Sequence, residues 1–169
     1  MIRVANQHCQ TDCGPVAVYN LVRVMKGDAA PKGGYALHRS RLARACGYKP
    51  GFGAGEANIL RAAELELDDI ARLVRRRATW PNLTAQLERR GRGGRSCGGL
   101  VSYWKPGMPD RTSHIVAVWI NYEKTAIWAA NAYAGSGAAL WAIAAAGKWW
   151  PTQVAPRDEH LHAFHQVVF

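Results

Sequence analysis

At 169 residues the chain has the size of one domain and can bury a hydrophobic core without help from disulfides. Apolar residues make up 49% of it, but no uninterrupted apolar run reaches the length of about eighteen residues that a membrane span needs. The net charge of +10 and the pI near 9.9 favour negatively charged partners, which include nucleic acid, anionic membranes and acidic protein substrates. The N-terminus has no apolar signal core, so we expect a cytoplasmic protein, or one of a host cytoplasm if the source is viral.

The four cysteines do not form the pattern of a secreted or zinc-binding protein. Cys9, Cys13, Cys46 and Cys97 are too few for a disulfide framework and lack paired CxxC spacing. Cys9 and Cys13, with His8 beside them, could begin a metal site only with ligands from distant parts of the chain. We therefore expect reduced thiols, no metal and no cofactor.

A first helix is predicted directly after residue 12. Thr11 or Asp12 can cap it, Pro15 falls in its first turn, and Gly27 ends it after Lys26. Residues 28–36 read as a loop and residues 37–46 as a short basic helix.

Helical patterns continue through the middle of the chain. Residues 49–55 are a Gly-rich segment that lacks the Lys-Ser/Thr of a phosphate-binding loop, so we interpret it as a connector. Helical periodicity is predicted over 56–77, with a break near Asp68 and Asp69, and again over 81–90. Arginines are concentrated between positions 72 and 95, which indicates either a binding face for nucleic acid or an acidic partner, or a solvated surface.

Short strands are predicted after residue 97. They cover 99–104, 114–121, 125–130 and 163–169, whereas 134–150 could be a loop with a short helix or another strand. Helices first and antiparallel strands afterwards predict an α+β fold in a single domain over 1–169, helical over about 1–96 and β over about 97–169.

Cys13 is the candidate nucleophile. It lies where the first helix begins and is followed by Gly14; the N-terminus of a helix favours the thiolate form of a cysteine. Gln7, six residues earlier, could donate its side-chain amide to a carbonyl oxygen as that oxygen becomes negative.

A thiolate nucleophile also needs a base, and His114 is the candidate because it opens a patterned strand after a loop rich in Gly and Pro. Asn131 ends the next strand. If these strands form a hairpin, their outer ends meet, and Asn131 would orient the imidazole of His114.

These residues, in the order Gln7, Asp12-Cys13-Gly14-Pro15, His114 and Asn131, resemble the papain-like cysteine peptidases, most closely the bacteriocin-processing C39 branch. The resemblance implies a nucleophile helix packed on a C-terminal antiparallel sheet. It also implies Cys13 as nucleophile, His114 as general base and acid, Asn131 as the residue that orients it, and Gln7 as oxyanion donor. Members of that branch usually have Asp-Pro where this chain has Asn131-Ala132.

The leading hypothesis is thus a free-standing cysteine peptidase that cleaves a peptide or isopeptide bond through a thioester. Acyl transfer and deconjugation use the same triad and stay open. A second class is a catalytically silent protein that binds nucleic acid or an acidic partner through its arginines. The basic character of 28–96 favours acidic substrates. The histidines near the C-terminus fit a solvated strand in which His160 and His162 share a face and His165 points away.

Overall fold

The computed structural model describes residues 5, 11–68, 71–91, 97–104, 113–120, 126–131, 139–144 and 161–169, with only the backbone at 90, 91, 126, 131 and 139–144. The helices are α1 (Cys13–Lys26), α2 (Tyr35–Ala45), α3 (Glu56–Glu66) and α4 (Trp80–Gly91), and a 3-10 turn, η1 (Gly27–Ala29), follows α1. The strands are β1 (Arg72–Arg76), β2 (Cys97–Trp104), β3 (Ser113–Ile120), β4 (Ala126–Asn131), β5 (Ala139–Ala144) and β6 (Leu161–Val168). The predicted α+β class is confirmed.

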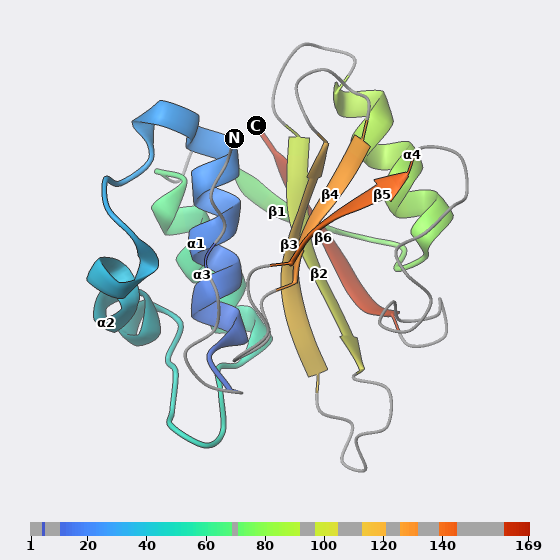
Figure 1. Ribbon diagram of the computed structural model, residues 1–169. Helices are drawn as coiled ribbons and strands as arrows, with labels where there is room; N and C mark the ends of the chain where they lie inside the picture. The colour runs from blue at the N-terminus through green and yellow to red at the C-terminus, as the bar shows by residue number, and fades with distance from the viewer. Residues whose placement is uncertain are drawn as a thin grey trace.

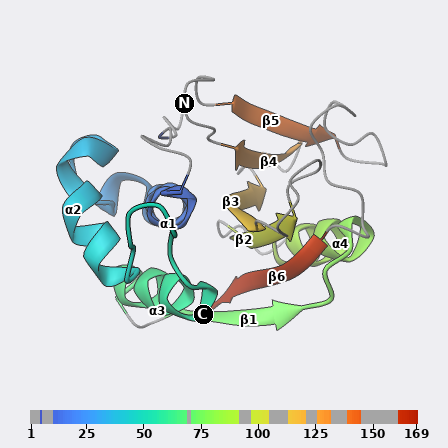
Figure 2. The ribbon, with the colours of Figure 1, turned by 90° about the horizontal axis from the view of Figure 1, so that it is seen from below.

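The six strands form one antiparallel sheet in the order β1-β6-β2-β3-β4-β5. β2 to β5 follow one another as hairpins, and β6 returns to lie between β1 and β2. Helices α1, α2 and α3 lie on one side of this sheet and α4 on the other (Figure 1). The view from below shows the same layers (Figure 2). None of the described helices is long and apolar enough to cross a membrane.

The predicted helix over 56–77 is wrong in its second half. α3 ends at Glu66, and Asp68 adopts a left-handed backbone with a φ of 63°. The chain then continues as β1, which pairs along its whole length with β6. Over so short a segment, Leu73 and Val74 fit the hydrophobic period of a helix as well as that of a strand. The segment forms a strand because it pairs with β6.

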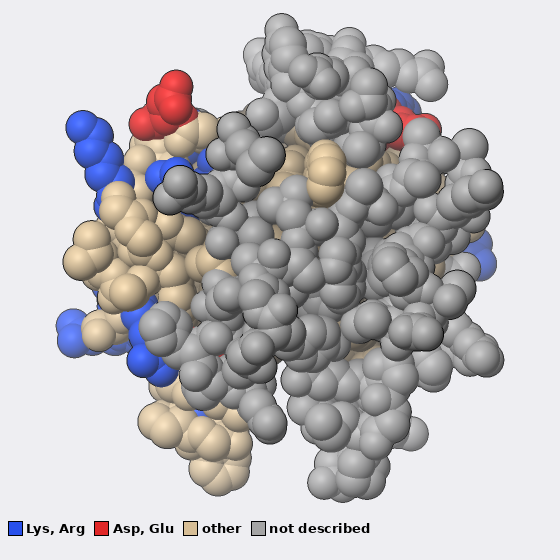
Figure 3. All heavy atoms as spheres, viewed as in Figure 1, with Lys and Arg blue, Asp and Glu red and all other residues tan. Residues whose placement is uncertain are grey.

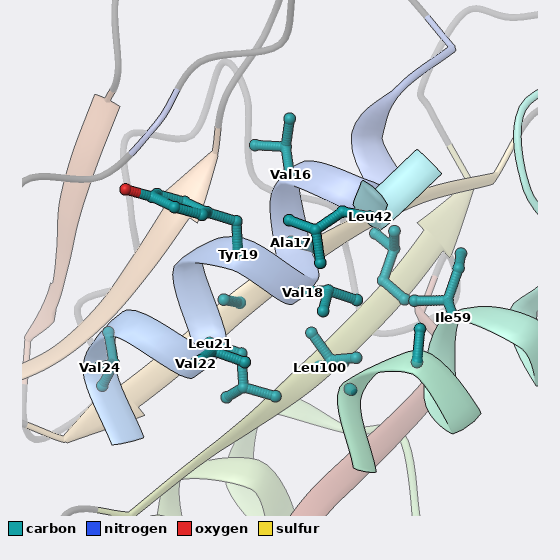
Figure 4. Packing of buried hydrophobic residues seen from close by; sticks show 14 of the residues in the cluster. Val16, Ala17, Val18, Tyr19, Leu21, Val22, Val24, Leu42, Ile59 and Leu100 are labelled. Carbon is teal, nitrogen blue, oxygen red and sulfur yellow. The ribbon is translucent and has the colours of Figure 1, made fainter. Parts of the chain in front are cut away.

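Alternation along the strands divides the core into two parts. We call the part under α1 the α1 cluster; it includes Leu100 of β2 and Ile115, Ala117 and Trp119 of β3. Figure 4 shows side chains of α1 and Ile59 of α3 packed with Leu100. We call the other part the α4 cluster. It joins α4 to the alternate strand positions Val101, Tyr103, Val116, Val118 and Ile120. Successive residues of a strand point to opposite faces of the sheet, so they enter the two clusters alternately.

The arginine-rich segment is not one face of one element. Arg72 and Arg75 are exposed on the edge strand β1, Arg89 is exposed on α4, and Arg76 donates its Nε–H to Gln166 Oε1 at 3.1 Å. Charged side chains on an edge strand also discourage pairing with another chain. Lys and Arg side chains are scattered along the helical side of the face drawn in Figure 3, between uncharged residues.

Candidate active site

Cys13 is the first residue of α1, as predicted, and its thiol is partly exposed and in no disulfide. The helix behind it is buried from Gly14 to Val22 and packs on β3, so the position of the thiol is fixed by the core. Gly14 allows α1 to pack closely on α3, because a Cβ there would lie 2.6 Å from Ile59 Cδ1.

Cys13 opens on a cavity of about 510 Å³ between α1, α3 and the sheet. The other described lining residues are Thr11, Gly51, Phe52, Gly53, Ala54, Glu56, Ile59, Ser102, Ser113 and Ile115. Glu56 carries the one charged side chain among them. The walls described here therefore provide no Lys or Arg for an acidic substrate, in contrast to the expectation from the basic composition.

The Gly-rich segment forms one wall of this cavity. Gly51 and Gly53 have φ values of 79° and 84°, which favour glycine, and Lys49 donates its backbone N–H to the Gly53 carbonyl oxygen at 2.8 Å. Between the two glycines, Phe52 is 91% exposed at the cavity. The sequence alone indicated only a connector here; the signal for a structured turn was the Gly-Phe-Gly spacing.

Asp12, next to the nucleophile, is buried and paired. Its Oδ2 lies 3.8 Å from Nε of Arg39 and accepts a hydrogen bond of 3.4 Å from the hydroxyl of Tyr35. Asp12 occupies the N-cap position of α1, but its side chain makes no capping hydrogen bond. Burial, followed by the charge of Asp12, raises the pKa of Tyr35, which keeps this hydroxyl a donor. The carboxylate is thus engaged with two side chains of α2.

His114 lies on the face of the sheet opposite to Cys13, which corrects the expected pairing of the two. The β2–β3 register sets His114 directly opposite Tyr103, and the two ring centroids are 5.4 Å apart. Tyr103 belongs to the α4 cluster, and His114 is buried beside it. Its neighbours Ser113 and Ile115 line the Cys13 cavity instead, because successive side chains of a strand point to opposite faces. The hairpin of β3 and β4 was predicted correctly, but the face of His114 was not.

Asn131 is the last residue of β4, where its backbone pairs with Ala139 of β5. The pairing of Ala117 with Ala130 places this end of β4 beside the first half of β3, so the backbone of Asn131 lies at the same end of the hairpin as His114. Gln7, the expected oxyanion donor, lies outside the described residues.

Two histidines of β6 approach the cavity wall, and sequence reasoning missed them. Nε2 of His162 lies 3.5 Å from Oε2 of Glu56, and Nε2 of His165 lies 3.5 Å from Oε1. The Ser102 hydroxyl donates to the same carboxylate over 3.3 Å. We call Glu56, Ser102, His162 and His165 the Glu56 cluster. The expectation that His165 points away into solvent is wrong, because His165 is buried.

The other described thiols differ from Cys13 in being buried. Burial, together with the charge of Glu66, raises the pKa of Cys46 to about 12, so this thiol stays protonated. Cys97 is buried at the start of β2, with its Sγ 3.8 Å from Nε2 of Gln166. Cys9 and His8 lie outside the described residues. Within the described part of the chain, no group of three His, Cys, Asp or Glu side chains could hold a metal ion.

The cavity combines a nucleophile at a helix start with a carboxylate and hydroxyls among its other lining residues. Such a set can attack an electrophilic carbon and move protons, which are the elements of acyl chemistry. Comparisons of the chain with protein-family models, with curated proteins and with solved structures returned no match.

Proposed function

We propose that this chain is a papain-like cysteine hydrolase in which Cys13 attacks the carbonyl carbon of a peptide or isopeptide bond. The observation that carries the proposal is a partly exposed thiol, in no disulfide, at the first residue of a buried helix that opens on a cavity of about 510 Å³. The packing of that helix against an antiparallel sheet supports the papain-like layout.

The chemistry takes two steps. The thiolate of Cys13 adds to the carbonyl carbon, the C–N bond breaks as the amine takes up a proton, and a thioester remains. Water then adds to the thioester, and the C–S bond breaks to release the acid. In this proposal the backbone N–H of Cys13 and the side chain of Gln7 hold the oxyanion. A base is needed as well, and His114 does not supply it from its place on the α4 face, which weakens the Cys13-His114-Asn131 triad.

Two alternatives use the same chain differently. Transfer of the acyl group to an amine instead of water would give an acyltransferase, whereas hydrolysis of an isopeptide bond would give a deconjugating enzyme. An amine acceptor added to the assay separates transfer from hydrolysis by the mass of the product. A binding protein for nucleic acid or an acidic partner would use the arginines. Because these are divided between β1 and α4, the geometry favours it less.

The test is labelling with an epoxide that traps papain-like thiols, resolved by intact mass and peptide mapping at neutral pH. Wild type should take up one equivalent at Cys13, and Cys13→Ala should take up none. Cys46→Ala and Cys97→Ala are matched controls, because each removes a thiol that is buried; both should label like wild type. Slow labelling spread over several cysteines would contradict the hydrolase and leave the basic surface as the better indication of function.

A further inference from the structure

The Cys13 thiol has to lose a proton and the leaving amine has to gain one, so the cavity needs an acid–base group on its own side of the sheet. The structure describes four of the six histidines. His114 lies across the sheet, and His38 lies on α2. His162 and His165 are the described histidines that contact a side chain lining the cavity.

A β-bulge brings these two histidines together. Ser102 of β2 pairs with Ala163 of β6, but the next residue, Tyr103, pairs with Leu161, so His162 is the extra residue. In a regular strand two residues three positions apart point to opposite faces. The bulge reverses the alternation at one point and lets both imidazoles reach the same carboxylate.

The surroundings give the two histidines different roles. Burial lowers the pKa of His165. The negative charge of Glu56 raises this pKa, whereas Arg75 of β1 and His162 lower it further. The neutral form of His165 is thereby favoured, and its Nε2 at 3.5 Å from Glu56 Oε1 is placed to hold the carboxylate in position. The side chain of His162 is 37% exposed and packs on the ring of Trp104 at a centroid distance of 4.8 Å, so solvent reaches it.

We propose that Glu56 and His162 form the acid–base pair of the Cys13 cavity, with Ser102 and His165 as positioning residues; this inference rests on the proposed hydrolase. The Cys13 proton passes to the Glu56 carboxylate and on to His162, leaving carboxylate and imidazolium. That proton returns by the same route to the leaving nitrogen as the C–N bond breaks. In the second step the pair takes a proton from the attacking water as it adds to the thioester, and the sulfur leaves as thiolate.

The experiment measures the rate constant for alkylation of Cys13 by iodoacetamide in the full chain, resolved by peptide mapping, from about pH 5 to about pH 9. The variants are Glu56→Gln and His162→Gln, each of nearly unchanged size. His38→Gln and His114→Gln are the matched histidine controls. Melting curves show which variants fold, and Glu56 and His162 are exposed enough for their variants to do so.

Glu56→Gln and His162→Gln should each slow alkylation near pH 7 by about tenfold, and should move the midpoint of the pH profile toward the value of about 8.5 of an ordinary thiol. His38→Gln should keep the wild-type profile. Wild-type rates in both Glu56→Gln and His162→Gln would overturn the pair, and a loss confined to His114→Gln would return the role to that residue. If wild-type Cys13 reacts only like an ordinary thiol, the hydrolase itself fails, and the pair with it.

Discussion

Replacement of Gly14 by alanine tests whether the start of the nucleophile helix is packed as the structure indicates. The added Cβ would lie 2.6 Å from Cδ1 and 2.9 Å from Cγ1 of Ile59, and 3.5 Å from Cβ of Ala54. Alanine is favoured over glycine inside a helix by about 1 kcal/mol, whereas an extra carbon in a packed core costs about 1–3 kcal/mol. Ile59 is buried and β-branched and can move little, so we expect a net loss of about 1–2 kcal/mol in unfolding free energy.

The assay is urea unfolding followed by circular dichroism, arranged as a double-mutant cycle. Ile59→Ala removes both contacting carbons, so Gly14→Ala should cost less in its presence, with a coupling of about 2–3 kcal/mol, which is the expected net loss plus the helix preference of alanine. Ile59→Val removes Cδ1 alone and should give a smaller coupling. Gly34→Ala is the control, because no heavy atom lies within 4 Å of a Cβ built there. Additive effects, or a stabilising Gly14→Ala, would refute the packing argument.

Three further predictions concern the sheet and two buried groups. Gly99→Ala would place a Cβ 2.3 Å from the backbone carbonyl oxygen of His165, and should lower the free energy of unfolding by about 3 kcal/mol; an unchanged urea midpoint would exclude that contact. Cys46 is buried and its pKa is raised to about 12, so at about pH 8 it should react with a maleimide only as fast as the chain unfolds. Labelling of the native protein at the rate of an ordinary thiol would contradict its burial. Because burial lowers the pKa of His165, the unfolded chain binds the proton more tightly, so this group destabilises the fold increasingly as the pH falls below about 6.5 and has no such effect well above it. The stability advantage of wild type over His165→Gln should therefore shrink by up to about 1.4 kcal/mol between about pH 7.5 and about pH 5.5, whereas a constant difference in urea unfolding would show that His165 binds protons equally in both states.

Much of the secondary structure follows from local signals in the sequence. The first helix begins at Cys13 and ends before Gly27, as the proline and glycine positions predict, whereas the N-cap residue Asp12 makes no side-chain capping hydrogen bond. β2, β3, β4 and β6 are found within two residues of the predicted strands. The error over 72–76 has a clear cause, since a short apolar pair between arginines fits a helix or a strand until β6 is there to pair with it.

The candidate site was predictable only in part. A cysteine followed by glycine at a helix start is a local feature, and it identified Cys13 as the nucleophile candidate. The cavity wall was not predictable, because Glu56 and Ser102 come from elements far apart in the sequence and meet only through packing.

The sequence by itself determined where α1 begins and ends, because proline and glycine act through the dihedral angles of neighbouring residues. Only the tertiary structure decided which histidines share a side of the sheet with Cys13. The face of His114 depends on the register of β3, and a shift of one residue would reverse it. The convergence of His162 and His165 on Glu56 depends on one extra residue in β6, which is defined only once β2 lies beside it.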